Sequence, residues 1–166
     1  NFLMNGVDDV SIPPASASVA TFDEHTQELP EGYVKIPMYD VNLSAGVGNA
    51  VWIVRENDEP IIFREGWLRR NGYNTNELKG MYVKGHSMLD TLHNMDTVII
   101  NIADTEIVDG EIYAANYKNN LFIKEIRRHE DGIYLISRNK DYETITVSNG
   151  DCDLFQILGK MVWRGG

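Results

Sequence analysis

Met81-Tyr82-Val83-Lys84-Gly85-His86-Ser87-Met88-Leu89-Asp90-Thr91-Leu92 is the segment from which the rest of the chain can be interpreted. An apolar run ends at a glycine, and Ser87 follows where the backbone is expected to turn into a helical segment. Ser87-Met88-Leu89-Asp90 fits the Ser-x-x-Asp pattern of a helix start, so Ser87 could simply cap that helix. A serine at such a corner also lies beside free backbone N–H groups, here those of Ser87 and Met88, which can stabilise an oxyanion. The two interpretations are compatible.

A second segment, Leu121-Phe122-Ile123-Lys124-Glu125-Ile126, has the composition of a strand with a lysine inside it. Alternation would place Lys124 on the same face as Phe122 and Ile126. Burial there would disfavour the ammonium and lower the lysine pKa from its usual ~10.4. Such a lysine can take the proton of a serine hydroxyl. Alternation alone favours a simpler interpretation, a lysine at a sheet edge that extends its ammonium into water.

His86 is a poorer candidate base than Lys124. Adjacent side chains in an extended backbone point to opposite faces, so His86 would be directed away from Ser87.

Taken together, these segments resemble the LexA-like self-cleaving repressor family, whose catalytic core is shared with bacterial type I signal peptidases. The resemblance covers about residues 34–164. It is carried by Gly85-His86-Ser87-Met88, Thr91-Leu92, Asp96-Thr97-Val98-Ile99-Ile100, Phe122-Ile123-Lys124-Glu125-Ile126, Leu135-Ile136-Ser137-Arg138-Asn139, Tyr142 and Ile157-Leu158-Gly159-Lys160-Met161-Val162-Trp163. In that family a serine attacks a peptide bond of its own chain and a lysine is the general base. The resemblance assigns these roles to Ser87 and Lys124.

The sequence departs from the family pattern at two places. His86 stands where an acidic residue is common, and Asn94-Met95-Asp96 replaces the usual Asp-Gly-Asp turn. Neither change removes the nucleophile or the base.

The resemblance also implies a scissile Ala–Gly bond on a loop that can enter the cleft. Ala45-Gly46, within Leu43-Ser44-Ala45-Gly46-Val47-Gly48, is the matching pair. A small side chain followed by a flexible glycine would let the loop enter a narrow site in an extended form. An ordinary Gly-rich turn is the alternative interpretation.

Residues 1–33 have the composition of a linker, with Ser11-Ile12-Pro13-Pro14-Ala15-Ser16-Ala17-Ser18 followed by acidic residues. Phe2-Leu3-Met4-Asn5-Gly6 resembles the end of the helix-turn-helix domains that precede this type of repressor. We therefore expect a 1–33 linker that follows a missing DNA-binding domain, and a peptidase and dimerisation domain over 34–166. A short native extension is the alternative.

Composition narrows the possible functions. The formal net charge is −10, from 15 Lys and Arg against 25 Asp and Glu. A chain this acidic is a poor candidate for binding the phosphates of a nucleic acid by itself. One cysteine excludes an internal disulfide, and the four histidines lack ligand spacing, so we expect neither a metal nor a cofactor. No apolar stretch is long enough to span a membrane, and we expect a cytoplasmic protein.

Short apolar runs separated by turn signals predict a mainly β, partly open barrel with short helices. Strands are expected at 34–41, 51–54, 97–101, 111–117, 121–128, 133–137 and 154–163, with one short helix over 63–72. Lys118-Asn119-Asn120 should form a tight turn, because asparagine tolerates a positive φ.

The predicted function is that of the C-terminal regulatory domain of a prophage-type repressor. It would form a homodimer, hold a DNA-binding domain on its operator, and inactivate the repressor by cutting itself in the SOS response. By resemblance, the trigger would be a RecA filament on single-stranded DNA. The alternatives are a non-cleaving module controlled by an antirepressor protein, a UmuD-like accessory subunit of a DNA polymerase, and, more distantly, a signal peptidase.

Overall fold

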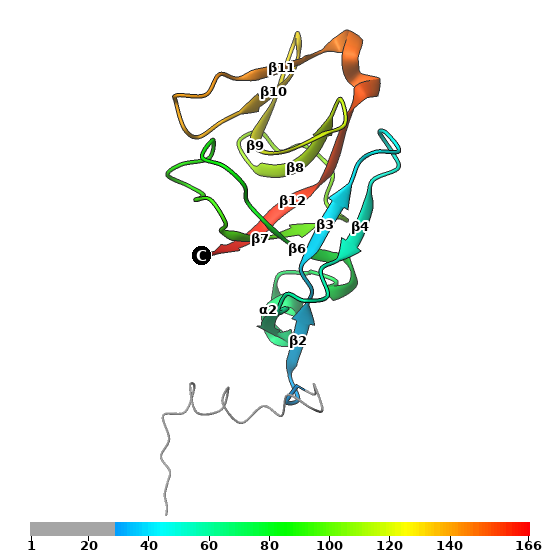
Figure 1. Cartoon of the computed structure of the whole chain (residues 1–166), viewed down its shortest axis with the longest axis vertical. Helices are drawn as coiled ribbons and strands as arrows, with labels where there is room; N and C mark the ends of the chain where they lie inside the picture. Colours follow the sequence, from blue (N-terminus) through cyan, green and yellow to red (C-terminus); the bar gives the residue numbers. More distant parts are fainter. Residues whose placement is uncertain (1–28) are drawn as a thin grey trace, which may run out of the picture. The chain divides into compact units, whose positions relative to one another are not determined.

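The computed structural model describes residues 29–166, and the predicted helix end and linker in residues 1–28 lie outside them. The chain separates into two units, Asn1–Tyr33 and Val34–Gly166, and the second contains the candidate site. The prediction of a mainly β fold is confirmed (Figure 1). The elements are β2 (Tyr33–Ile36), β3 (Tyr39–Asn42), β4 (Val51–Val54), β5 (Ile61–Arg64), α2 (Glu65–Arg70), η1 (Thr75–Glu77), β6 (Leu78–Tyr82), β7 (Thr97–Asn101), β8 (Ile112–Tyr117), β9 (Asn120–His129), β10 (Gly132–Ile136), β11 (Ile145–Ser148), η2 (Asn149–Leu154) and β12 (Phe155–Gly165).

Seven strands form one sheet in the order β11-β10-β9-β8-β12-β7-β6, and β2–β5 and β3–β4 form separate pairs. The strands of the large sheet pair antiparallel, and β9 lies in its interior between β8 and β10. The predicted tight turn joins β8 to β9, with φ of 53° at Lys118 and 63° at Asn119. Two positive φ values in a two-residue loop match the twist of a hairpin.

Two expected elements have different bounds. The single strand expected over 34–41 is divided at Pro37, because β2 pairs with β5 whereas β3 pairs with β4. At this division the N–H of Gly80 donates to the Pro37 carbonyl at 3.0 Å. The helix expected over 63–72 is shorter, since residues 63 and 64 belong to β5. It ends before Asn71 and Gly72, as predicted.

The helix expected after Ser87 is wrong. Residues 83–96 form turns without a helical element. Only scattered bonds of helical type occur there, such as Leu92 N–H to the Met88 carbonyl at 2.8 Å. Isolated turns this short do not propagate as a helix unless tertiary contacts favour it.

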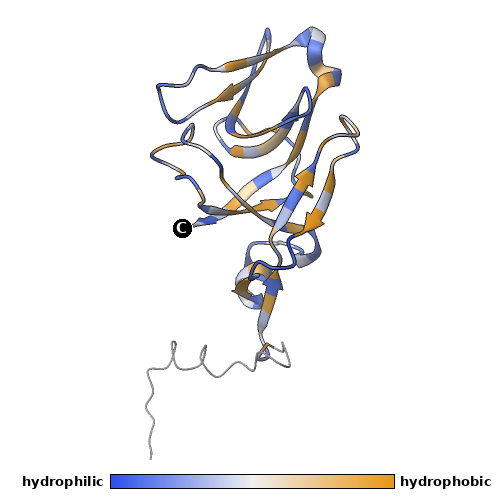
Figure 2. Cartoon of the chain, in the orientation of Figure 1, coloured by the Kyte–Doolittle hydropathy of each residue, from blue (hydrophilic) through white to orange (hydrophobic). Residues whose placement is uncertain are grey.

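The two faces of the sheet bury different apolar clusters because side chains alternate along each strand. Ala114 of β8 belongs to a cluster with Met81, Met88 and Leu92. Its neighbour Tyr113 belongs to another cluster, which contains Ile126. Figure 2 shows hydrophobic and hydrophilic residues succeeding one another along the strands.

The β3–β4 hairpin covers the face of the sheet that carries Ala114. Leu43 is part of this buried cluster, and Val41, Ala50 and Trp52 pack against it. The connecting loop over 43–50 is therefore held beside the sheet at one end of the hairpin.

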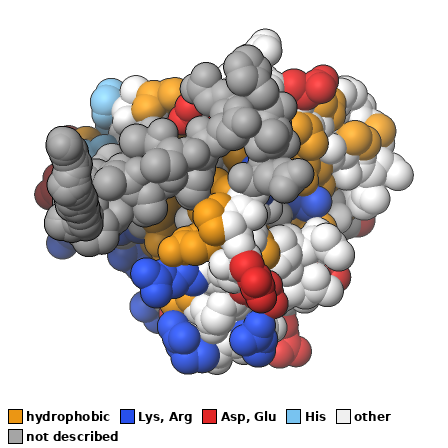
Figure 3. Space-filling view, turned by 90° about the horizontal axis from the view of Figure 1, so that it is seen from below, with side chains coloured by type: hydrophobic (Ala, Val, Ile, Leu, Met, Phe, Trp, Pro, Cys, Tyr) orange, Lys and Arg blue, Asp and Glu red, His pale blue; other side chains and the backbone are white. Residues whose placement is uncertain are grey.

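Positive side chains gather with apolar ones on the face seen from below (Figure 3). In α2, Arg69 donates to Glu65 one turn away at 2.7 Å, which is an exposed ion pair of the helix surface.

No helix among residues 29–166 is long and apolar enough to cross a membrane.

Candidate active site

Ser87 lies on the turn-rich segment that follows β6. Gly85 begins this segment with φ of +89°, a value that glycine adopts without strain, and its N–H donates to Asn94 Oδ1 at 2.8 Å. Met88 and Leu92 are 1% and 0% exposed and fix the segment to the core. Ser87 is thus presented by a loop whose two neighbouring anchors are buried.

Asn139 binds the backbone carbonyl groups of two consecutive residues, His86 and Ser87. Its side-chain Nδ2 donates to the His86 carbonyl at 2.9 Å, and its backbone N–H donates to the Ser87 carbonyl at 3.0 Å. These two bonds join the loop that follows β10 to the serine segment.

Lys124 is buried inside the sheet, with only 6% of its surface exposed, and is directly opposite Tyr113 of β8. Its Nζ donates to Ser87 Oγ at 2.6 Å. The alternative of an edge lysine extending into water is therefore wrong, because β9 is an interior strand and the amine is directed toward Ser87.

Burial lowers the pKa of Lys124 from its ordinary value, because the buried ammonium loses hydration. Within residues 29–166 no carboxylate forms an ion pair with its Nζ that would restore the charged form. Neighbouring Glu125 accepts from Arg127 and Arg138, at 2.7 Å each, on the other side of the strand. The arrangement favours an unprotonated amine beside a hydroxyl.

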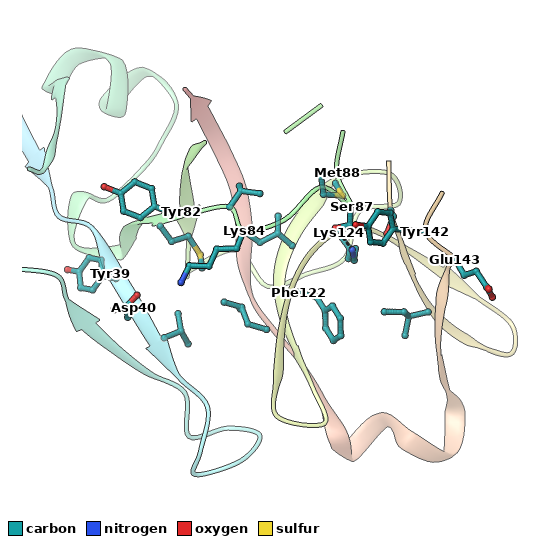
Figure 4. Close-up of a pocket in the computed structure, with 17 residues that line it drawn as sticks. Tyr39, Asp40, Tyr82, Lys84, Ser87, Met88, Phe122, Lys124, Tyr142 and Glu143 are labelled. Carbon is teal, nitrogen blue, oxygen red and sulfur yellow. Dashed lines mark hydrogen bonds between the residues drawn. The ribbon is translucent and has the colours of Figure 1, made fainter. Parts of the chain in front are cut away.

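A cleft of about 540 Å³ opens over this pair. Figure 4 shows Ser87 and Lys124 together beside the Tyr142 ring, with Tyr39 and Asp40 toward the other end of the cleft. Most of the remaining lining is apolar, from Val41, Met81, Val83, Met88, Leu121, Phe122, Ile123 and Ile145. A cleft of this shape and composition can accept an extended peptide segment with small or apolar side chains.

The predicted oxyanion groups also lie at the cleft, since Ser87 and Met88 both line it. Within the described part of the chain, neither of their backbone N–H groups donates a hydrogen bond. Two free N–H groups beside the hydroxyl are what a developing oxyanion requires.

Ala45 and Gly46 lie outside the cleft, on the loop of the β3–β4 hairpin. The Ala45 carbonyl accepts from Asn49 Nδ2 at 3.2 Å, and the Gly46 N–H donates to the Leu43 carbonyl at 3.0 Å. Both polar groups of this peptide bond are therefore occupied within the loop. The structure brings Ser87 and Lys124 together and leaves Ala45-Gly46 apart from them.

The supporting residues Asn139 and Arg138 were not predicted as site residues. Arg138 donates to Glu125 at 2.7 Å and to Thr91 Oγ1 at 3.2 Å, which ties β9 to the serine segment. Both residues belong to a motif that carries the family resemblance. Their contacts join segments about fifty positions apart, however, which residue patterns alone do not specify.

Among residues 29–166, no three His, Cys, Asp or Glu side chains gather closely enough to hold an ion.

Residues 37–162 match the family described as Peptidase S24-like. The chain is 30% identical over 159 residues to the Repressor protein CI of Enterobacteria phage phi80, covering 92% of this chain and 65% of that protein. It is 28% identical over 155 residues, with the same coverage, to a protein of Haemophilus influenzae named Uncharacterized HTH-type transcriptional regulator. It is also 33% identical over 116 residues to the HTH-type transcriptional regulator PrtR of Pseudomonas aeruginosa, covering 68% of this chain and 44% of that protein.

The chain thus spans about 65% of the length of the first two relatives. The family match extends over most of the chain and includes both Ser87 and Lys124. The predicted resemblance to the LexA-like repressors is confirmed, and the chain belongs to the Peptidase S24-like family.

Proposed function

We propose that this chain is the self-cleaving regulatory domain of a prophage-type transcriptional repressor, with Ser87 as nucleophile and Lys124 as general base. The observation that carries the proposal is the 2.6 Å contact between Ser87 Oγ and the Nζ of a lysine that is 6% exposed. A buried lysine without a carboxylate partner is unfavourable for folding, and such strongly perturbed lysines are typical of sites where an amine activates a hydroxyl.

In the proposed reaction, Ser87 Oγ attacks the carbonyl carbon of Ala45 while Lys124 Nζ takes the hydroxyl proton. The N–H groups of Ser87 and Met88 stabilise the oxyanion of the tetrahedral intermediate. The C–N bond to Gly46 then breaks, and the Lys124 ammonium returns its proton to the departing amine. Water, deprotonated by the same lysine, hydrolyses the ester on Ser87 and releases the Ala45 carboxylate.

The loop must change conformation before this reaction can begin. The Ala45 carbonyl and the Gly46 N–H have to leave their bonds to Asn49 and Leu43 so that the segment can extend into the cleft. A resting loop of this kind would make cleavage slow and conditional, as a repressor requires while it is active.

The repressor role is supported by the relatives, whose names include a phage CI repressor and HTH-type regulators. The domain would form a homodimer and would be joined, through the residues around 1–33, to a helix-turn-helix domain that binds operator DNA. Linked half-sites bind far more tightly than separate ones through effective concentration. A cut at Ala45-Gly46 would separate DNA binding from dimerisation, in response to a RecA filament in the SOS response.

A second candidate function is a non-cleaving dimerisation module that an antirepressor protein controls. The observation that favours it is the closed loop, in which both polar groups of the Ala45-Gly46 bond are occupied.

Intact-mass analysis after incubation at alkaline pH distinguishes the two candidates. The wild type should yield two fragments that meet at Ala45-Gly46, and Ser87→Ala and Lys124→Ala should stay intact under the same conditions. A wild-type chain that stays intact even with a RecA filament on single-stranded DNA would favour the non-cleaving module.

A further inference from the structure

Gln156 of β12 connects the Ala45-Gly46 loop to the large sheet. The Gly48 N–H donates to Gln156 Oε1 at 2.9 Å, across 108 positions of sequence. Within residues 29–166, this is the single hydrogen bond between loop 43–50 and the seven-stranded sheet. The other bonds of the loop are internal, or join it to Asn42 at the end of β3.

Asn116 of β8 lies directly opposite Gln156 in the sheet. Opposed residues of antiparallel strands point to the same face, with Cβ atoms about 4.5–5.5 Å apart. Asn116 is 0% exposed, and neither its Nδ2 nor its Oδ1 has a hydrogen-bond partner among the described residues. It is two residues beyond Ala114 on the face that the β3–β4 hairpin covers.

We propose that Gln156 is a positioning residue that holds the Ala45-Gly46 loop at rest, and that Asn116 is the partner that Gln156 takes when the loop leaves. This inference rests on the proposed function, because it concerns the regulation of the same reaction. In the resting state, Gln156 Oε1 accepts from the Gly48 N–H, and the side-chain amide of Asn116 has no hydrogen-bond partner among the described residues. In the released state, the two side-chain amides can bond to each other and both are satisfied.

The two residues act on the loop in opposite directions. Loss of the Gln156 acceptor removes a bond that exists only at rest, so the loop should leave more often. A buried amide without partners is costly, so Asn116 raises the free energy of the resting state relative to the released one. Replacing Asn116 by leucine, which has a similar volume and no polar atoms, should therefore make the loop leave less often.

Hydrogen exchange at the Gly48 amide measures loop release without any cleavage. We would measure it by NMR in a Ser87→Ala chain, with amides of the β8–β9 ladder as an internal reference for global stability. Gln156→Ala should accelerate Gly48 exchange roughly 2- to 10-fold, as expected for one neutral hydrogen bond. Gln156→Glu keeps an acceptor oxygen and should restore slow exchange, whereas Asn116→Leu should slow exchange below that of the parent.

The same substitutions in the chain that retains Ser87 should change the self-cleavage rate in the same order. Unchanged Gly48 exchange in Gln156→Ala would overturn the proposal, and faster exchange in Asn116→Leu would remove Asn116 from it. Exchange could change as expected while none of the chains that retain Ser87 is cleaved at Ala45-Gly46. That result would support Gln156 as the residue that holds the loop and would contradict the proposed function.

Discussion

Lys124 is the residue on which the proposed chemistry of this domain depends. A lysine that is 6% exposed and bonded to a hydroxyl cannot hydrate its ammonium as it would in water. Burial therefore lowers the pKa of Lys124 below its ordinary value of 10.5 in the folded chain. At pH values between the lowered pKa of Lys124 in the folded chain and its ordinary pKa in the unfolded chain, the unfolded chain binds more protons. The free energy of unfolding should therefore rise with pH across that window. Below the folded-state pKa of Lys124, the buried ammonium should destabilise the fold by its full amount.

Replacing this lysine by an apolar residue should stabilise the fold at neutral pH. In a Ser87→Ala background, Lys124→Met should raise the free energy of unfolding at pH 7 by on the order of 1 kcal/mol. That corresponds to a Tm increase of about 2–4 °C for a chain of this size. The gain should shrink as pH rises toward 10, because the unprotonated lysine has no such cost.

Lys84→Met is the matched control, because Lys84 lines the same cleft but is exposed. Its Tm should change little at any pH. A lower Tm for Lys124→Met than for its parent at pH 7 would show that Lys124 is not held in an unfavourable environment.

At the scale of elements, the serine segment is positioned by Asn139, in the loop that follows β10. Asn139→Ser keeps a side-chain oxygen that can accept from the Asp141 N–H, as Asn139 Oδ1 does at 3.0 Å. It loses the Nδ2 donor to His86 and adds no charge near Lys124. We expect the maximal self-cleavage rate to fall roughly 10-fold, since small displacements of a nucleophile are costly. The pH at which the rate levels off should stay the same, because Lys124 remains buried. A shift of that pH with an unchanged maximal rate would contradict a positioning role.

The packing of β12 against β7 depends on the absence of a side chain at Gly159. A Cβ there would lie 2.5 Å from the Asn101 carbonyl oxygen and 2.6 Å from Ile100 Cγ2. Gly159→Ala should therefore destabilise the fold by about 1–3 kcal/mol in chemical denaturation. Gly150→Ala in η2, where a Cβ meets nothing within 4 Å, is the control and should be close to neutral. Equal stabilities for the two variants would mean that β12 and β7 can separate without cost.

The sequence predicted those elements whose local signals agree with their tertiary environment. The β8–β9 hairpin was predicted because Asn119 accepts a positive φ, and β9 because its apolar residues alternate around Lys124. The helix after Ser87 was predicted from a capping pattern, but that segment follows contacts with Asn94 and Asn139 instead. No prediction covered β11, whose four residues follow a polar segment and gain strand structure by pairing with β10.

Within the site, the Ser87–Lys124 contact was predicted and the resting position of the Ala45-Gly46 loop was not. Strand alternation could place Lys124 on a buried face, and the family resemblance supplied its partner. The bond from Gly48 to Gln156 joins segments 108 positions apart, so no local pattern contains it.

At the scale of the whole molecule, charge limits what this chain can bind by itself. With a formal net charge of −10, it should repel the phosphates of duplex DNA, and Arg69 of α2 is already paired with Glu65. We expect no measurable binding of this chain to a labelled duplex in fluorescence anisotropy at about 50–200 mM salt. Binding that weakens steeply as salt increases would show that this domain contacts DNA directly.

The measurement that tests the central claim most directly is the first-order rate constant of self-cleavage as a function of pH, followed by intact mass at several protein concentrations. The logarithm of the rate should rise with a slope near one while Lys124 loses its proton, and it should level off below pH 10.5. The rate should not depend on concentration, since the bond and the nucleophile belong to one chain. A rate that does not change with pH, or that survives in Ser87→Ala, would contradict a reaction driven by Ser87 and Lys124.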